Sequence, residues 1–258
     1  MPGSIKKSPT PRRSVLTDET YEMIRNLILD HHIPPGAKVN IDALAARLKV
    51  SQTPIRESLA RLESERLITK VALKGYTTTG LLTIEEFRDL YHLRLLIEPW
   101  AAGEAATRID GVGKSALLAE MKSARAVLKL TNVERVHSLT EHDTRFHRLV
   151  SRMSGNGSVH EAFNQMHCHL HLFRLYLATK NEEGKNEKST KLLMDLVEGS
   201  FTTESAKITI EEHEEITAAI NAGDSKKAQG AMQSHIKSSM KRFSPAAKVM
   251  DEKKKGKK

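Results

Sequence analysis

The chain of 258 residues is long enough for one large domain or two ordinary ones, and its 4% aromatic content suits a helical protein better than a β-sandwich. The single cysteine, Cys168, excludes a disulfide framework within the chain, and no apolar run approaches the roughly 18 residues that a membrane span requires. Lys and Arg number 41 against 32 Asp and Glu, a formal charge of +9, and without a secretory signal we expect a cytoplasmic protein that makes no use of a membrane.

The positive charge is unevenly distributed along the chain. Residues 1–79 carry a net charge of +5, residues 80–244 are neutral, and residues 245–258 carry +4. We therefore expect a flexible basic arm over residues 1–14, a DNA-binding domain over 15–79, a neutral helical domain, and a disordered lysine-rich tail. A basic block beside a neutral domain favours a polyanionic partner, whereas a lysine tail is more often only solvated.

Three helices are predicted within residues 15–79. Thr17 or Asp18 can cap the first helix, which ends before Pro34-Pro35-Gly36. A short second helix begins at Asp42, and a third begins near Gln52–Pro54, where a proline in the first turn is tolerated. The apolar stripe of the third helix consists of Ile55, Leu59, Leu62 and Leu67.

Two β-prone runs follow, residues 68–71 and 76–79, and they predict a hairpin. Three helices and a hairpin are the outline of a winged helix-turn-helix, whose third helix fits the DNA major groove. Arg56 can bond guanine O6 and N7, while Ser51 and Thr53 suit phosphate oxygens at a helix N-terminus. The full set of candidate DNA contacts is Arg47, Ser51, Gln52, Thr53, Arg56, Lys74 and Gly75. An ordinary α+β domain with a solvated helix end is the alternative.

From residue 80 onward the periodicity predicts helices alone, so the fold class is mainly α. Thr83 and Glu86 form a capping box for a long helix over residues 84–109, and Gly111–Gly113 is expected to separate this helix from the next. Further helices are expected over residues 115–130, 133–153, 160–179, 191–197, 209–222 and 225–243. Long helices joined by short turns are typical of an antiparallel bundle.

Residues 34–68 closely resemble the N-terminal signature of GntR-family transcription regulators. The densest part of the match is Val50-Ser51-x-Thr53-Pro54-Ile55-Arg56-Glu57-x-Leu59 at the third helix. The sequence departs from that pattern at Gln52, where the family most often has Arg, and at Arg66, where it usually has Gly.

Residues 80–244 are similar to the FCD effector domain of the FadR-type subfamily. The motifs that carry the resemblance are Leu90-Tyr91-x-Leu93-Arg94, Glu98-Pro99, Asp143-x-x-x-His147, Glu212-His213, Gly223-Asp224 and Met232-x-x-His235. The span between His147 and His213 is long for the family, and we assign the excess to residues 180–206.

A metal site is implied by this resemblance. Asp143 and His147 lie four residues apart on one helix face, a spacing that alone is more typical of ordinary polar packing. In metal-binding FCD domains the ligands correspond to Asp143, His147, His213 and His235. One carboxylate and three imidazoles suit Zn²⁺ best, with Ni²⁺, Mn²⁺ or Fe²⁺ as further choices, and leave a position for a ligand. Members of the fold that respond to acyl ligands lack such a site, so a metal-free regulator is the alternative.

Two arginines stand in apolar helix segments, Arg94 and Arg174, and a buried guanidinium needs a carboxylate partner. Arg94 can pair with Glu98 four residues later, or it can clamp an effector carboxylate, the role that the resemblance favours. Arg174 is open to the same two interpretations, and His171 can line the effector pocket. Polar packing on a half-buried helix is expected for His167 and His169. The histidines expected at the surface or at helix caps are His31, His32, His92, His137, His142 and His160.

Together these features predict a ligand-responsive transcriptional regulator. Because one recognition helix covers only a half-site, we expect a homodimer on a near-palindromic double-stranded operator. A small organic acid would bind at the metal, and the resemblance implies that repression is then relieved. The sequence has no nucleophile–base arrangement, phosphate-binding glycine loop or HExxH motif, so an enzyme is not expected.

Overall fold

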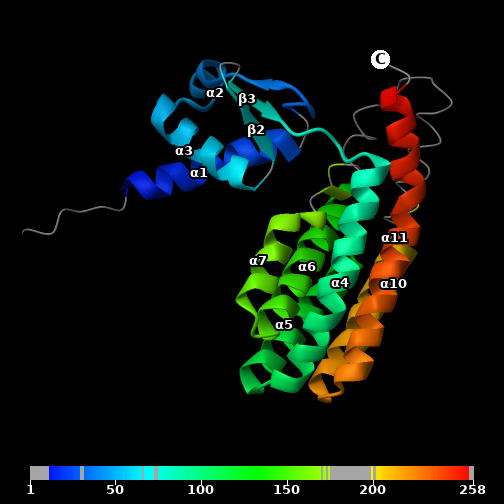
Figure 1. The fold of residues 1–258 in the computed structure, drawn as a ribbon. Helices are drawn as coiled ribbons and strands as arrows, with labels where there is room; N and C mark the ends of the chain where they lie inside the picture. The colour runs from blue at the N-terminus through cyan, green and yellow to red at the C-terminus, as the bar shows by residue number, and fades with distance from the viewer. Residues whose placement is uncertain are drawn as a thin grey trace, which may run out of the picture. The chain divides into compact units, whose positions relative to one another are not determined.

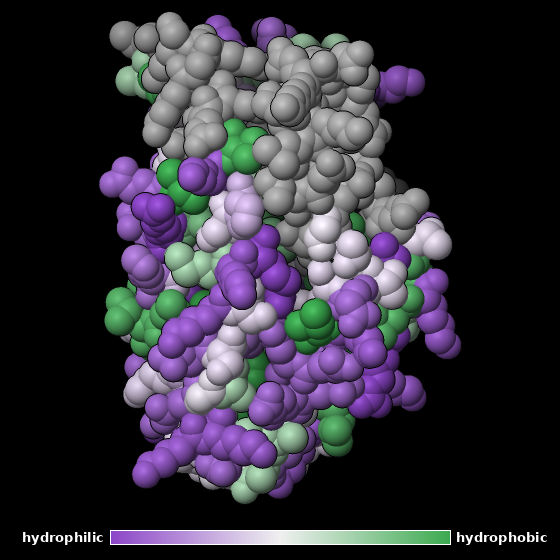
Figure 2. Space-filling view, turned by 90° about the vertical axis from the view of Figure 1, so that its right-hand side faces the viewer, coloured by the Kyte–Doolittle hydropathy of each residue, from purple (hydrophilic) through white to green (hydrophobic). Residues whose placement is uncertain are grey.

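The computed structural model describes residues 12–29, 32–65, 67–72, 75–169, 171, 172, 174, 199 and 202–255. The chain divides into two compact units, Met1–Gly80 and Leu81–Lys258, drawn in Figure 1. No helix in the described ranges is both long enough and apolar enough to cross a membrane. The face of the molecule in Figure 2 is mostly hydrophilic, and hydrophobic residues appear on it as separate patches.

The first unit is a winged helix-turn-helix. Its elements are α1 (Arg12–Leu29), β1 (Lys38–Val39), α2 (Ile41–Leu48), α3 (Gln52–Ser64), β2 (Ile68–Val71) and β3 (Gly75–Thr78). The strands form an antiparallel sheet in the order β1-β3-β2, in which Thr77 faces Lys38 on one side and Thr69 on the other. The two-residue strand β1 was not predicted, because two residues carry no readable alternation.

The core of this unit lies where α1 packs on α3. Residues of both helices are fully buried there, and they include Ile24, Ile28, Ile55, Leu59 and Leu62. At about 25 cal/mol per Å² of buried apolar surface, such side chains supply most of the stability of a small domain. Ile55, Leu59 and Leu62 of the predicted stripe are therefore confirmed as the core face of α3, whereas Leu67 is buried but follows the end of that helix.

The predicted start of the first helix is wrong. Helix α1 already begins at Arg12, directly after Pro11, so the first three residues after Pro11 are helical rather than part of a flexible arm. Thr17 and Asp18 lie inside the helix and contact α3 instead of capping α1. Thr17 Oγ1 donates to Glu57 Oε2 over 2.8 Å, and Arg61 Nη1 donates to Asp18 Oδ1 over 3.1 Å. Residues 1–11 of the predicted arm lie outside the described residues.

The second unit is a helical bundle. Its described helices are α4 (Ile84–Arg108), α5 (Gly111–Val127), α6 (Asn132–Met153), α7 (Gly157–Met166), α10 (Thr203–Asn221) and α11 (Ser225–Lys255). Helix α4 contacts α6, α7, α10 and α11, and α10 and α11 run alongside it in Figure 1. The predicted capping box is present, because Thr83 Oγ1 accepts from the Glu86 N–H while Glu86 accepts from the Thr83 N–H.

Three boundaries in this unit differ from the prediction. The break after α4 lies just before Gly111–Gly113: α4 ends at Arg108, and Asp110 Oδ1 accepts from the Gly113 N–H over 2.7 Å, so residues 111–113 belong to the capped first turn of α5. The helix expected over 160–179 is interrupted at His167, which has a left-handed backbone with φ of 46°. The tail expected from residue 245 is helical to Lys255, because Pro245 removes one backbone hydrogen bond without ending α11. The helix expected over 191–197 and most of residues 180–206 lie outside the described residues.

Candidate functional site

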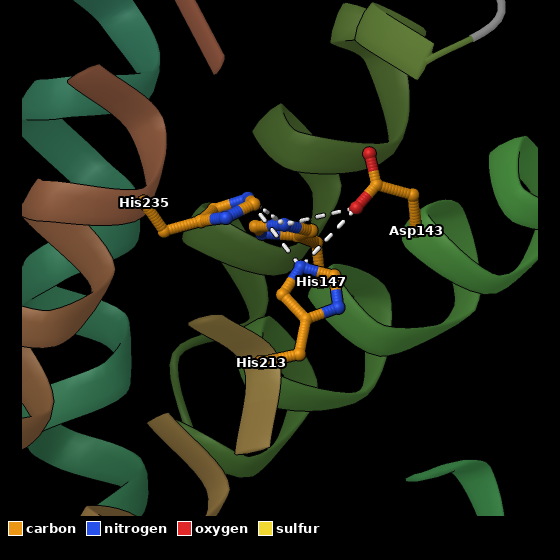
Figure 3. Close-up of side chains that lie close together, drawn as sticks. All are labelled: Asp143, His147, His213 and His235. Carbon is orange, nitrogen blue, oxygen red and sulfur yellow. Dashed lines mark hydrogen bonds and ion pairs between the residues drawn. The ribbon is translucent and has the colours of Figure 1, made fainter. Parts of the chain in front are cut away.

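Four predicted ligands converge inside the bundle, as Figure 3 shows. Asp143 and His147 come from α6, His213 from α10 and His235 from α11. One donor atom from each lies within 4.8 Å of all the others. The Nε2 atoms of His147 and His235 are 3.1 Å apart, and His213 Nε2 lies 3.2 Å from Asp143 Oδ1. The three imidazoles are fully buried, so bulk water does not hydrate their nitrogen atoms.

Two of these histidines have a carboxylate beside Nδ1, the ring nitrogen that points away from the centre of the cluster. His147 Nδ1 lies 2.5 Å from Glu98 Oε2, and His235 Nδ1 lies 2.8 Å from Glu212 Oε2. A carboxylate can only accept, so the proton of the neutral His235 ring sits on Nδ1 and its Nε2 lone pair faces the centre, and Glu98 places the same kind of acceptor beside His147 Nδ1. Metal-binding histidines are oriented in this way by carboxylate partners.

The third histidine is held by another histidine. His213 Nδ1 lies 2.9 Å from His142 Nε2, and His142 Nδ1 lies 2.8 Å from Glu120 Oε1. With the His142 proton directed at Glu120, His142 Nε2 accepts from His213, and the His213 Nε2 lone pair also faces the centre. His142 was expected at the surface, and that prediction is wrong. Its partners come from α5 and α10, and no local spacing could reveal them.

An arginine pairs with each of the three carboxylates. Arg94 Nε lies 2.6 Å from Glu98, Arg145 Nε lies 3.0 Å from Glu120, and Arg242 Nη2 lies 3.4 Å from Glu212. Each ligand histidine is therefore linked by close contacts, directly or through His142, to a carboxylate, and that carboxylate pairs with an arginine. We call each such series of contacts an arm. Burial would raise the pKa of the Glu98 carboxyl, but Arg94 and His147 hold that pKa far below its usual range. Glu120 and Glu212 also have lowered pKa values, since their His and Arg partners outweigh burial.

Asp143, His213 and His235 have the protonation states that a metal requires. Burial lowers the pKa of both His213 and His235, so their rings are neutral, while neighbouring histidines outweigh burial and lower the pKa of Asp143. Asp143 Oδ1 is buried and accepts no hydrogen bond from the described residues. Converging lone pairs and an unsatisfied carboxylate oxygen are costly by themselves and are satisfied by a divalent cation. The residues therefore fit a metal.

His169 also reaches this site, although its sequence context favoured ordinary polar packing. Its Nε2 lies 3.1 Å from Asp143 Oδ2, and burial lowers its pKa to about 3. In a continuous helix through residue 179, His169 would have pointed away from the pair His167 and His171. The left-handed residue at His167 ends α7 and redirects the chain. Positive φ at a non-glycine residue carries no clear sequence signal.

The predicted effector residues Arg94, Arg174 and His171 have different surroundings. Arg94 is fully buried, donates to Glu98, and also contacts Cys168 Sγ at 3.3 Å, so the internal pair that the sequence allowed is present. Arg174 is fully buried, and burial lowers its pKa to about 10. His171 is half-buried. None of the three lines the pocket that opens beside Asp143 and His235.

Four of the predicted DNA contacts lie exposed at the N-terminal end of α3, namely Ser51, Gln52, Thr53 and Arg56. Ser51 is the N-cap residue, but its side chain makes no capping hydrogen bond. Gln52 donates to Asp42 Oδ1 over 2.5 Å and accepts from Arg56 Nη2 over 3.2 Å, which orients the guanidinium. Arg47 is exposed on α2, and Gly75 starts β3 with φ of 86°. Lys74 and Arg66 lie outside the described residues, and α3 already ends at Ser64.

Comparison with known proteins matches both units. Residues 16–77 match the domain of bacterial regulatory proteins of the gntR family, and residues 89–238 match the FCD domain. The chain belongs to the GntR family and carries an FCD domain. This GntR-family protein is thus a DNA-binding transcriptional regulator, and its FCD domain implies binding of a small-molecule effector. Its families and relatives consist of regulators rather than enzymes.

Individual relatives differ in coverage. The Nta operon transcriptional regulator of Aminobacter aminovorans is 40% identical over 82 residues, which are 32% of this chain and only 39% of that protein. The transcriptional repressor GlaR of Escherichia coli is 24% identical over 225 residues, 84% of this chain and 90% of that repressor. The solved structure of E. coli McbR/YncC has a TM-score of 0.62 at 15% identity and covers 86% of this chain and 94% of that chain, a likeness of fold alone.

Proposed function

We propose that this GntR-family regulator binds a divalent transition metal at Asp143, His147, His213 and His235 and senses a small carboxylate beside it. One observation carries the proposal: each ligand imidazole is held at Nδ1 while its Nε2 faces the centre. Zn²⁺ suits this donor set best, with Ni²⁺, Mn²⁺ and Fe²⁺ as further choices. When bound, the metal supplies a Lewis-acidic position for an anionic ligand.

The charges of the site favour an anion as the effector. The three carboxylates behind the histidines are each paired with an arginine, so Asp143 is the single negative group facing the centre among the described ligands. A divalent cation there leaves a net charge of about +1 in a buried site, where Coulomb interactions are strong. A carboxylate neutralises that charge.

Elemental analysis tests the metal proposal directly. The full chain, purified without added metal, should contain about one first-row transition metal per chain, and the double variant Asp143→Ala/His147→Ala should contain none. A wild-type protein without metal, purified under the same conditions, would contradict the proposal and direct the search towards an acyl-type effector. Equal metal in both proteins would place the ion elsewhere in the chain.

The regulator is further proposed to act as a homodimer on a near-palindromic operator in the cytoplasm. One α3 helix covers only a half-site, and two-fold symmetry in the protein matches a palindrome in the DNA. The exposed face of α4 supports this, because Leu93, Leu96 and Trp100 follow one another at helical spacing and are 40%, 75% and 41% exposed. Repression relieved by the effector is the proposed mode of control, and the relative GlaR of Escherichia coli is itself a repressor.

A charge on this face should separate the two copies. We expect Leu96→Asp to give a monomer in analytical ultracentrifugation, while the wild type sediments as a dimer, because the aspartate would lose its hydration inside an apolar interface. Leu118→Asp on α5 is the matched control, since Leu118 is 59% exposed and lies on another helix. A dimeric Leu96→Asp protein would show that a different surface joins the copies.

Arg56 is expected to read a base. Arg56→Ala should weaken binding to an operator selected from random DNA by about 1–3 kcal/mol, with a smaller loss on unrelated DNA. Titrations of both DNAs by fluorescence anisotropy at one salt concentration measure the two losses. Equal losses on the two DNAs would assign Arg56 to phosphate contacts.

A further inference from the structure

Gln52 lies between two charged side chains on the exposed surface of the DNA-binding unit. It is the first residue of α3, and Arg56 follows it one helical turn later. Gln52 Nε2 donates to Asp42 Oδ1 over 2.5 Å, and Gln52 Oε1 accepts from Arg56 Nη2 over 3.2 Å. Asp42 belongs to the first turn of α2, so these bonds connect the two helices of the helix-turn-helix.

The two neighbours fix the orientation of the Gln52 amide. A carboxylate can only accept hydrogen bonds, so the NH₂ group of the amide faces Asp42. A guanidinium can only donate, so the amide oxygen faces Arg56. The opposite orientation would place donor against donor and acceptor against acceptor. Gln52 therefore presents its donor and its acceptor in one defined order.

The amide keeps hydrogen-bonding capacity for a base. Its NH₂ group has two N–H donors and its oxygen has two lone pairs, and the bonds to Asp42 and Arg56 use one of each. One donor and one acceptor remain side by side. Adenine matches this pair in the major groove, because its N7 accepts and its N6 amino group donates. Guanine does not match, since N7 and O6 both accept.

The separation of the two head groups matches the spacing of neighbouring base pairs. Gln52 Oε1 and Arg56 Nη2 are 3.2 Å apart, and successive base pairs of B-DNA are about 3.4 Å apart along each strand. Two side chains bonded to each other in this way can reach adjacent base pairs while they keep their mutual hydrogen bond. Asp42, Gln52 and Arg56 are all exposed, so none has to leave the protein core to meet DNA.

We propose that Gln52 reads an adenine in the base pair next to the guanine read by Arg56, and that Asp42 is a positioning residue for the Gln52 amide. The inference rests on the proposed base contact of Arg56 and adds a second specificity-determining residue beside it. Each operator half-site then carries a guanine contact and an adenine contact in neighbouring base pairs. Asp42 acts through its bond to Gln52 Nε2 rather than by touching a base.

Selection of binding sites from a randomised DNA library by the full chain tests the role of Gln52. The guanine whose preference disappears in Arg56→Ala marks the reference position, and the wild type should prefer adenine in an adjacent pair. Replacing that A·T pair by G·C should weaken wild-type binding about tenfold in fluorescence anisotropy, whereas Gln52→Ala should bind both DNAs equally. Gln52→Arg should prefer guanine there, because a guanidinium donates to both O6 and N7.

The role of Asp42 is tested by base preference as well as by affinity. Asp42→Asn introduces an amide that donates as well as accepts, so the Gln52 amide is no longer fixed and most of the preference for adenine should be lost. Glu22→Gln is the matched control, because it removes the same charge from a 58% exposed side chain on α1. This control should keep the full preference for adenine.

The outcomes separate the three residues. Equal losses of affinity on all sequences in Gln52→Ala would assign Gln52 to phosphate contacts, and a wild-type preference for another base beside the guanine would overturn the adenine assignment. An unchanged preference in Asp42→Asn would overturn the positioning role of Asp42. If Arg56→Ala lost no guanine preference, the base contact of Arg56 would fall; an adenine preference that disappears in Gln52→Ala would still support Gln52. Circular dichroism checks that each variant is folded.

Discussion

Replacement of Glu98 by alanine should lower the free energy of unfolding of the metal-free protein by about 3–5 kcal/mol. Glu98 is buried between Arg94 and His147, and its carboxylate is 2.6 Å from the fully buried guanidinium. Removing it leaves a charge inside the bundle without its carboxylate partner. Urea unfolding in the presence of a chelator, followed by circular dichroism, measures the loss.

Two further proteins make this result specific. Glu214→Ala removes the partner of Arg125, an ion pair whose side chains are 37% and 66% exposed, and should cost at most about 1 kcal/mol. The double variant Arg94→Met/Glu98→Leu replaces both charges by apolar groups and should recover most of the stability. A loss for Glu98→Ala no greater than that for Glu214→Ala would show that water reaches Arg94.

Zinc should stabilise the protein strongly, and His213→Ala should remove that gain. At a free zinc concentration a thousandfold above its Kd, the folded state gains about 4 kcal/mol, or roughly 8–16 °C in Tm for a domain of this size. Differential scanning calorimetry of metal-free and zinc-loaded protein measures the shift. The second unit, Leu81–Lys258, contains all four ligands, so its transition is the one to follow.

The control for this experiment is another histidine of α6. His137 has a side chain that is 48% exposed and lies outside the cluster, so His137→Ala should keep the full zinc stabilisation. If His213→Ala were stabilised by zinc as much as wild type, the ion would bind elsewhere. If zinc stabilised neither protein, the cluster would be polar packing without a metal.

Much of the fold follows from local patterns in the sequence. The stripe of Ile55, Leu59 and Leu62 predicted α3 and its core face, and Thr83 with Glu86 predicted the start of α4. These signals depend on residues within one or two helical turns of each other. The predicted start of α1 and the predicted end of α11 were wrong, because Thr17 and Asp18 lie inside α1 rather than at its start and Pro245 lies inside α11 without ending it.

The site was predictable only in part. Asp143 and His147 form a local pair, and the resemblance supplied His213 and His235. The supporting residues His142 and His169 were missed, since their contacts join different helices or depend on the left-handed residue at His167. Arg242 was missed because nothing near it in the sequence marks its pairing with Glu212 on another helix. Contacts of this kind need the packing angles of the bundle, which local patterns do not contain.

Helix α4 connects the metal centre to the first residues of the helical bundle. It begins at Ile84, close to the boundary between the units, and carries Glu98 against His147 further along the same rigid rod. The two positions are about 21 Å apart along the axis, at 1.5 Å per residue. If α4 tilted by about 5° with Glu98 as the pivot, its first turn, about 21 Å away, would move by almost 2 Å. Sub-ångström changes at the ligand would then be magnified where the chain continues towards the DNA-binding unit.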